Sequence, residues 1–262
     1  MIGGFDLFQN AIVRIPASNF ADGLTTVDLG VPDYENAIQQ HAFYCEALLE
    51  CGLTLTTLAA DLAYPDSTFV EDTAVCTPRG AILTRPGAAS RIGEVDAVRD
   101  AIRRFFPSIA EIEAPGTLDG GDICEAEDHF FLGRSLRTNE EGIRQLAADL
   151  ARQGYSSSII DIRGLSSILH LKSGISYIGD NTLVVMEELA DQELFRNYRL
   201  IRVPADESYA ANSVRVNSRV LIAAGYPRLT AELLDRGFHP VVLEMSEFRK
   251  MDGGLSCLSL RF

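Results

Sequence analysis

The C-terminal stretch Met251–Phe262 reads MDGGLSCLSLRF and sets the pattern that the rest of the chain follows. Asp252, Gly253 and Gly254 indicate a turn, because glycine reaches backbone conformations that are barred to residues with a Cβ atom. A short apolar strand pattern follows, and Cys257 lies between two serines within it. This position could hold a thiol at the mouth of a cleft, although the stretch by itself favours a packed structural cysteine.

The same order of polar turn, strand, turn, strand, helix and strand recurs about five times, at roughly 40 to 50 residues per unit. The units differ in sequence, so the repeat is one of structure. Strand pairs with a helix outside each pair predict units set around a central axis, with functional residues in the turns at one end. An ordinary doubly wound α/β sheet is the alternative.

Local patterns give the limits of the expected elements. Asp33 is expected to cap a helix that Gly52 ends, and Thr138 with Glu141 is typical of a capping box for a helix that Gly154 ends. Apolar spacing predicts helices over 33–52, 94–106, 138–154, 190–197 and 227–236. Alternation and turn residues predict strands over 10–15, 53–58, 69–76, 81–84, 109–112, 123–126, 129–132, 169–178, 182–186, 212–216, 220–224, near 241 and over 255–260.

Composition limits the class of protein. The chain has 262 residues and an apolar fraction of 47%, enough for a substantial core, and we expect one domain over 1–262. Its 23 basic and 37 acidic residues give a formal net charge of −14, which disfavours nucleic acid or an anionic membrane as partner and favours a cationic ligand. No segment approaches the roughly 20 apolar residues of a membrane span, and the first residues lack a signal-peptide pattern. We therefore expect a soluble, cytoplasmic protein.

The five cysteines, Cys45, Cys51, Cys76, Cys124 and Cys257, form an odd set without a C-x-x-C pair, and their spacing with the four histidines is unlike that of a zinc site. Neither disulfides nor a bound metal is expected. Helical spacing makes Cys45 and Cys51 packing residues. In a reducing compartment, an important cysteine acts as a nucleophile rather than in a bridge.

Two polar turns carry clustered carboxylates. In PDSTFVED, Asp66, Glu71 and Asp72 flank an apolar strand pattern, and in PGTLDGGD, Asp119 and Asp122 flank a double glycine. Such clusters fit a cationic ligand, and a solvated acidic surface is the alternative. A phosphate-binding glycine loop is disfavoured because the aspartates would repel the phosphate.

His170 opens a strand pair in the same position of its unit as Asp72, Asp119 and Asp252 do in theirs. A cysteine thiol needs a nearby base or cation to supply thiolate at neutral pH. Cys257, His170 and Asp119 could therefore form a Cys-His-Asp arrangement drawn from three units. A structural histidine is the alternative for His170.

Two arginines, Arg91 and Arg137, follow the second strands of two units. A guanidinium there could hold a substrate carboxylate through two hydrogen bonds, and a surface ion pair is the alternative for each. His129 and His239 hold no matching position, and we assign them no role.

Six segments carry a family resemblance: FVED (69–72), GTLDGGDI (116–123), LGRSLRTN (132–139), LHLKSG (169–174), ESYAAN (207–212) and DGGLSCLS (252–259). Together they resemble the dimethylarginine dimethylaminohydrolases, members of the guanidino-group-modifying (pentein) superfamily. The resemblance covers nearly the whole chain in order, and the combination is specific although each piece alone is weak. It implies a fivefold pseudosymmetric α/β propeller of ββαβ-type repeats around a central channel that holds the substrate.

By matching motif, the resemblance implies that Cys257 is the nucleophile, His170 the general acid and base, and Asp119 the carboxylate that orients the histidine. Some relatives have Glu at the Asp119 position. Arginine deiminases carry an aspartate two residues after the histidine, where this chain has Lys172, and this difference favours the methylarginine hydrolases. The residues implied to bind substrate are Leu24, Asp66 with main-chain oxygens for the α-amino group, Glu71 and Asp72 for the guanidinium, Arg91 and Arg137 for the carboxylate, and Met251 through its carbonyl.

The resemblance further implies an activity: hydrolysis of Nω-methylated arginine to citrulline and methylamine or dimethylamine through a covalent cysteine thioether, without a cofactor or a metal. The partner is then a small cationic guanidino substrate, and a homodimer is suggested. Two alternatives stay open. One is a related enzyme, such as an arginine deiminase-like hydrolase, and the other is a non-catalytic methylarginine-binding protein. The second is disfavoured because binding alone needs none of Cys257, His170 and Asp119.

Overall fold

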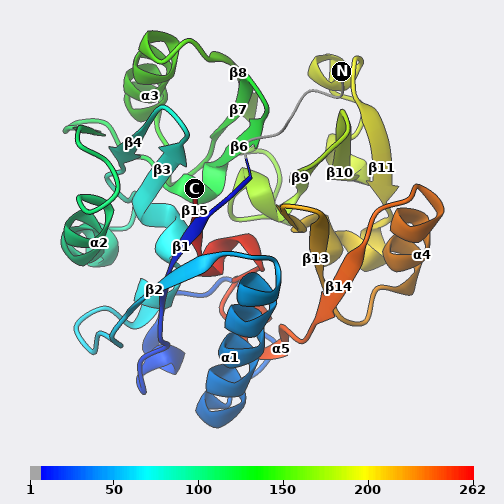
Figure 1. The fold of residues 1–262 in the computed structure, drawn as a ribbon, viewed down its shortest axis with the longest axis horizontal. Coiled ribbons are helices and arrows are strands. Elements are labelled where there is room, and N and C mark those ends of the chain that lie inside the picture. The colour runs from blue at the N-terminus through cyan, green and yellow to red at the C-terminus, as the bar shows by residue number, and fades with distance from the viewer. Residues whose placement is uncertain (1–6) are drawn as a thin grey trace.

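Five three-stranded sheets stand around one axis in the computed structural model, which describes residues 7–262 (Figure 1). Every sheet joins an antiparallel strand pair to a parallel one, which confirms the fivefold α/β propeller and rules out a single doubly wound sheet. The sheets are β15–β1–β2 (Leu260–Arg261, Asn10–Arg14, Thr54–Leu58), β3–β4–β5 (Ala74–Thr77, Gly80–Leu83, Ile109–Glu111), β6–β7–β8 (Ile123–Ala126, His129–Arg134, Ser156–Asp161), β9–β10–β11 (Ile175–Gly179, Thr182–Met186, Arg199–Val203) and β12–β13–β14 (Val214–Val216, Arg219–Ala223, Pro240–Leu243).

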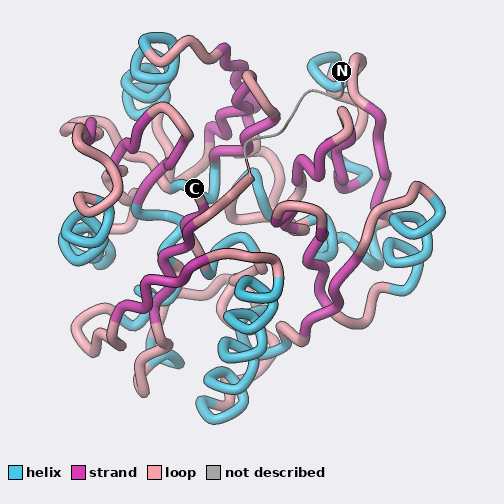
Figure 2. Tube along the Cα trace, in the orientation of Figure 1, coloured by secondary structure: helices cyan, strands magenta, loops and turns pink. Residues whose placement is uncertain are grey.

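The two described ends of the chain meet in one sheet. β15 pairs with β1 antiparallel, and the N–H groups of Gln9 and Asn10 donate to Phe262 O at 3.0 and 2.8 Å. One unit is therefore assembled from both ends of the chain, and its pairing closes the ring (Figures 1 and 2). This closure explains why the stretch that ends the chain continues the pattern of the other units.

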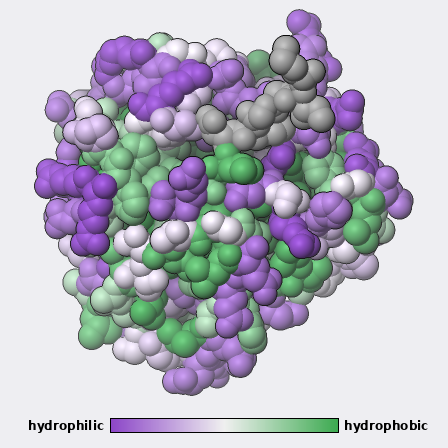
Figure 3. Space-filling model, viewed as in Figure 1, coloured by the Kyte–Doolittle hydropathy of each residue, from purple (hydrophilic) through white to green (hydrophobic). Residues whose placement is uncertain are grey.

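Helices cover the outside of the sheets (Figure 2). Each of four helices connects two parallel strands of one sheet, and each buries residues at helical spacing against its sheet. In α2, for example, Val98, Ala101 and Ile102 are buried. Polar side chains gather toward the rim of the face shown in Figure 3. The helices are α1 (Tyr34–Glu50), α2 (Val95–Ile102), α3 (Glu140–Arg152), α4 (Pro227–Asp235) and the short α5 (Ser246–Arg249).

Each unit is entered through a 3₁₀ turn, and these five turns pack against one another in series. Parts of the strands predicted over 69–76, 169–178 and 255–260 are therefore wrong. An alternating pattern needs one buried and one exposed face, but Phe69 to Thr73 are all buried, so the segment turns rather than extends. The entry turns are η3 (Val70–Thr73), η5 (Gly120–Asp122), η6 (Leu171–Ser173), η9 (Ala205–Ala211) and η10 (Ser256–Leu258).

The helix predicted over 190–197 is also wrong. Two separate 3₁₀ turns, Glu187–Leu189 and Glu193–Phe195, lie there instead. The buried residues of this segment, Leu189, Ala190 and Phe195, do not fall on one face of an α-helix, so a continuous helix would expose part of them.

The N-terminus of α3 is capped by Asn139, not by the predicted pair of Thr138 and Glu141. Asn139 Oδ1 accepts the N–H of Gly142 at 2.8 Å, and its Nδ2 donates to Pro115 O at 2.9 Å. The Thr138 hydroxyl donates to the buried Asp122 instead. Because Asp122 accepts the Thr138 hydroxyl, Thr138 cannot cap α3, and the capping position shifts by one residue to Asn139.

Within residues 7–262, no helix is long and apolar enough to cross a membrane. The expected lack of a signal peptide concerns a start that includes residues 1–6, which lie outside the described residues.

Replacing Asn139 with alanine tests the capping assignment. We expect Asn139→Ala to lower the free energy of unfolding by about 1–2 kcal/mol, because it removes the acceptor of the α3 N-terminus. Glu141→Ala, at the other end of the predicted capping box, should lower the free energy of unfolding less than Asn139→Ala does. Urea unfolding followed by circular dichroism measures both, and an equal or larger cost for Glu141→Ala would contradict the assignment.

Candidate active site

A closed ring of hydrogen bonds joins the five entry turns. Each bond links two neighbouring units, so the position of every turn is fixed by those on both sides. The members are largely buried, where a satisfied polar network is rigid. We refer to these bonds as the inter-unit ring: Gly121 N to Asp72 Oδ1 (2.9 Å), Leu171 N to Asp122 Oδ1 (3.0 Å), Asn212 Nδ2 to Lys172 O (2.8 Å), Asn212 Nδ2 to Ser256 Oγ (2.9 Å) and Ser256 Oγ to Glu71 Oε2 (2.7 Å).

The entry turns surround a narrow cavity of about 20 Å³, which is room for about one water molecule. The structure brings the predicted site residues together here, except that Asp119 lies behind His170 and the Glu71 carboxylate is turned away. The lining residues that the sequence did not indicate are Phe69, Leu169, Asp252 and Gly253. The full lining is Leu24, Asp66, Phe69, Asp72, Arg91, Arg137, Leu169, His170, Met251, Asp252, Gly253 and Cys257.

Cys257 lies in η10 at the side of this cavity. The N–H of Gly254 donates to its Sγ at 3.4 Å. Burial, with the negative charges of Glu71 and Asp72, raises the pKa of the Cys257 thiol to about 12. At neutral pH the empty site therefore holds a neutral thiol and not a thiolate.

The glycines beside Cys257 are required by close approach rather than by a special backbone angle. A Cβ atom on Gly253 would lie 2.3 Å from the ring of Phe69, and one on Gly254 would lie 2.4 Å from Asn212 Oδ1. The positive φ of this turn, 57°, belongs to Asp252. The sequence thus located the turn correctly, but for a different physical reason.

His170 and Asp119 form a buried pair, with His170 Nε2 2.9 Å from Asp119 Oδ2. Burial opposes the charged imidazolium, but the charge of Asp72 and the hydrogen bond to Asp119 outweigh it and raise the pKa of His170 to about 9. Asp119 Oδ1 is itself held by the N–H of Gly87 at 2.7 Å. The histidine is therefore protonated at neutral pH and fixed in orientation, as a general acid requires.

Asp72 and Arg91 form a second buried pair, in which Arg91 Nη1 donates to Asp72 Oδ2 at 2.5 Å. Although burial favours the neutral acid, the charges of His170 and Arg91 hold the pKa of Asp72 at about 2. The Arg91 guanidinium also bonds both oxygens of Glu94 and the carbonyl of Phe69. Its donors are thus committed within the protein, which differs from the free carboxylate clamp expected for Arg91.

Arg137 remains available. Its side chain lines the cavity and has neither a salt bridge nor a hydrogen bond with any other residue between 7 and 262. Asp66 lies nearby, and its carboxylate accepts the N–H of Leu24 at 2.9 Å. Burial raises the pKa of Asp66. A Cβ on Gly23 would lie 2.4 Å from Asp66 Oδ1, so the loop that carries Leu24 needs glycine there.

Glu71 is anchored outside the cavity. Its Oε1 accepts Lys172 Nζ at 2.6 Å, and its Oε2 accepts the Ser256 hydroxyl. Arg261 Nη2 lies 3.5 Å from the same carboxylate. In this arrangement Glu71 braces the turn of Cys257, whereas Asp72 alone of the adjacent pair faces the cavity.

Asp122 is a positioning residue whose role the sequence did not indicate. Its carboxylate accepts the hydroxyls of Ser135 and Thr138 and the N–H of Leu171, which follows His170. Burial raises the pKa of Asp122 to about 6. The double glycine before it was a signal, because a Cβ on Gly121 would lie 2.8 Å from Asp72 Oδ1.

One group of side chains could in principle hold a metal: atoms of Asp72, Asp119 and His170 lie within 4.8 Å of one another. These atoms already satisfy one another or neighbouring donors, since His170 bonds Asp119 and Asp72 bonds Arg91. The geometry thus matches an acid-base pair, and the absence of a metal stays a prediction.

Asp119→Asn tests the electrostatic setting of His170. Loss of this charge should lower the pKa of His170 from about 9 by roughly one unit or more. Because folding raises the pKa of His170 above its ordinary 6.5, the protonated imidazolium stabilises the folded protein. This contribution to the free energy of unfolding is complete below pH 6.5 and is lost as the pH rises through 9. Histidine NMR titration measures the shift, with His129 as an internal control, and an unchanged His170 would contradict the assignment.

Known proteins resemble this chain over nearly its whole length. A profile of the arginine deiminase family matches residues 61–223. An N(G),N(G)-dimethylarginine dimethylaminohydrolase from Pseudomonas aeruginosa is 46% identical over 257 residues, which cover 98% of this chain and 100% of the relative. One from Streptomyces coelicolor is 39% identical over 259 residues, covering 97% and 96%.

The solved structures agree. DDAH from Pseudomonas aeruginosa, a cysteine-to-serine mutant complexed with citrulline, superposes with a TM-score of 0.95 at 44% identity, covering 98% of this chain and all of that one. The N-terminal domain of a cyanobacterial arginine dihydrolase has a TM-score of 0.85 at 16% identity, covering 98% and 97%, and shares the fold alone. By sequence and structure together, the chain belongs to the dimethylarginine dimethylaminohydrolase family.

Proposed function

We propose that this protein hydrolyses Nω-methylated arginine to citrulline and methylamine or dimethylamine. The observation that carries the proposal is the convergence of Cys257, His170 and Asp72 on one cavity, with Asp119 behind the histidine. The relatives named dimethylarginine dimethylaminohydrolase and the neighbour that binds citrulline support this substrate class. The excess of acidic residues also favours a cationic substrate.

The side chains assign an orientation to the substrate. Asp72 receives the guanidinium, and Arg137, whose donors are free, receives the α-carboxylate. Asp66, with the main chain of Leu24 and Met251, receives the α-amino group. The empty cavity has room for about one water, less than an arginine-sized substrate needs, so we propose that the loop carrying the 42%-exposed Leu24 moves to admit the substrate.

The first half of the reaction forms a thioether. The cationic guanidinium offsets the negative charge around Cys257, so the thiol releases its proton to solvent as the substrate docks. The thiolate then attacks the guanidinium carbon, which forms the S–C bond of a tetrahedral intermediate. His170, protonated in the empty site, gives its proton to the departing amine as the C–N bond breaks.

The second half releases citrulline. The now neutral His170 takes a proton from water, and the hydroxide adds to the amidino carbon. Collapse of this second tetrahedral intermediate breaks the S–C bond and returns Cys257 to the thiolate, and the hydroxyl proton of the intermediate passes to solvent as the citrulline carbonyl forms. Asp72 cannot stabilise an oxyanion, because it is itself negative. It instead orients the guanidinium and localises its positive charge beside the sulfur.

We also propose a single catalytic domain over residues 1–262 that works as a homodimer in the cytoplasm. The family resemblance supports the homodimer, the five sheets around one axis support a single domain, and the five free cysteines support a reducing compartment. Light scattering of the purified chain in solution measures the oligomeric state, and a mass of one chain at micromolar concentration would contradict the dimer.

A panel of guanidines tests the activity. We expect mass spectrometry to detect citrulline from asymmetric dimethylarginine and monomethylarginine, with more turnover than from arginine. Cys257→Ser and His170→Ala should each lower kcat by about 10⁴-fold or more, because both groups take part in bond making and breaking. Cys51→Ser, outside the cavity, is the matched control. Citrulline from arginine alone would favour a deiminase, and activity in Cys257→Ser would contradict the nucleophile.

A titration of the thiol tests assistance by the substrate. The ultraviolet absorbance of the thiolate, taken as the difference between the wild type and Cys257→Ser, should appear near pH 12 in the free protein. A cationic amidine that fills the site without reacting should move this transition to lower pH, and by linkage should bind more tightly as pH rises. If the ligand leaves the transition unmoved, deprotonation does not depend on substrate charge.

A further inference from the structure

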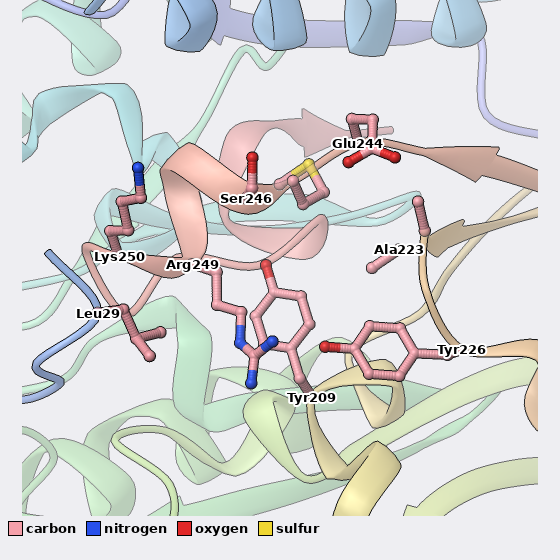
Figure 4. Close-up of a pocket in the computed structure, with 10 residues that line it drawn as sticks. Leu29, Tyr209, Ala223, Tyr226, Glu244, Ser246, Arg249 and Lys250 are labelled. Carbon is pink, nitrogen blue, oxygen red and sulfur yellow. The ribbon is translucent and has the colours of Figure 1, made fainter. Parts of the chain in front are cut away.

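A second cavity lies beside α5, outside the candidate active site (Figure 4). Its free volume is about 240 Å³, larger than the 20 Å³ of the candidate site. Since pockets for drug-sized ligands hold about 300–1,000 Å³, this cavity fits a smaller molecule. Its lining includes Leu29, Tyr209, Tyr226, Glu244, Met245 and Arg249.

Two charged groups in this cavity lack an ion-pair or hydrogen-bond partner among residues 7–262. The Arg249 guanidinium lies over the ring of Tyr209, 5.0 Å from its centre, but makes no salt bridge or hydrogen bond within the part of the chain that the structure describes. The Glu244 carboxylate is likewise unpaired among those residues. Lys250 differs, because its ammonium is 2.7 Å from Glu247. Within the described part of the chain, the cavity thus offers a guanidinium and a carboxylate without ion-pair partners.

The charges of these two exposed side chains complement those of a zwitterion. Figure 4 shows the Tyr226 hydroxyl directed toward Arg249 and Tyr209, while Glu244 lies apart from them beside Ser246. A ligand carboxylate would accept from the guanidinium and the hydroxyl, and an ammonium would donate to Glu244. Leu29 and Met245 supply apolar surface for a side chain. We propose that this cavity binds a free α-amino acid with an apolar side chain, and that the bound amino acid changes KM at the candidate active site.

Two chain segments connect the cavities. The loop that supplies Leu24 to the candidate site supplies Leu29 to this cavity, and α5 runs directly into the turn of Cys257. Tyr209, at the floor of this cavity, donates its hydroxyl to Gly253 O at 2.8 Å. Thr25 Oγ1 donates to Lys250 O at 3.0 Å and ties the two segments together. A ligand that orders these segments changes the opening of the candidate site, so its effect falls on KM rather than on the chemical step.

Calorimetry tests binding without turnover. The titrated protein is the full chain with Arg137→Met, which disables the carboxylate position of the candidate site. We expect L-leucine to bind saturably at one site, and L-leucinamide or 4-methylpentanoate to bind at least about tenfold more weakly, because each lacks one charge. Adding Arg249→Met or Glu244→Gln should weaken L-leucine by about the same factor. No saturable binding, or binding insensitive to both substitutions, overturns the site.

Kinetics test the coupling, and only this part rests on the proposed function. L-leucine should change KM for dimethylarginine in the wild type by about twofold or more, and the change should saturate, unlike simple competition. Arg249→Met should abolish the change at unaltered basal kcat, and Tyr209→Phe should reduce it while L-leucine still binds. If L-leucine binds but leaves KM unchanged, the coupling is overturned and the binding site stands. A chain that binds L-leucine but has no turnover refutes the proposed function instead.

Discussion

The inter-unit ring is the constraint on which the rest of the structure depends. Each unit buries only a small three-stranded sheet, and the entry turns would be free to move if each were held by its own sheet alone. The ring instead makes every turn an anchor for the next, from Asp72 through Asp122 and Asn212 to Ser256 and back to Glu71. Pairing between the two ends of the chain supports the same closure at the level of the sheets.

The ring also sets the electrostatics of the site. Bringing the turns together places several carboxylates in a buried space, where their charges act at high strength. The result is a His170 that holds its proton and a Cys257 that keeps its own, so the empty site is not a reactive thiolate. Arg91 and Lys172 offset two of the charges and leave the cavity negative enough to favour a cation. In the proposed reaction, the substrate brings the charge that activates the thiol.

Much of this could be predicted from the sequence. The recurrence of turn and strand predicted the fivefold arrangement, and the sequence placed Asp119, His170 and the turn before Cys257 at the entries of their units. Asp119 and His170 each directly precede an entry turn, whereas Cys257 lies within its own. The turn that opens each unit can be read from the local sequence. Closure of the ring of units then brings these turns close together in space. The turn before Cys257 was also found, although contact with Phe69 and not backbone freedom makes Gly253 necessary there.

What could not be predicted depends on tertiary contacts between side chains, within a unit or between units. Arg91 was predicted to bind the substrate carboxylate, but its guanidinium donates hydrogen bonds to Asp72 and Glu94 instead. Glu71 pairs with Lys172, about 100 residues away in sequence, which no local pattern encodes. The capping of α3 was displaced for the same reason, because the buried Asp122 competes for the hydroxyl of Thr138. Tertiary side-chain pairing therefore decides which polar residues face the cavity.

The claim that Cys257 carries the reaction can be tested most directly by trapping the intermediate. The protein is mixed with dimethylarginine, quenched in acid within the first turnover, and analysed by mass spectrometry of the intact chain and its peptides. The account predicts an added mass equal to the substrate less dimethylamine, located on the peptide of Cys257, that rises and then falls as citrulline forms. Formation of citrulline without this adduct, or an adduct on another cysteine, would contradict it.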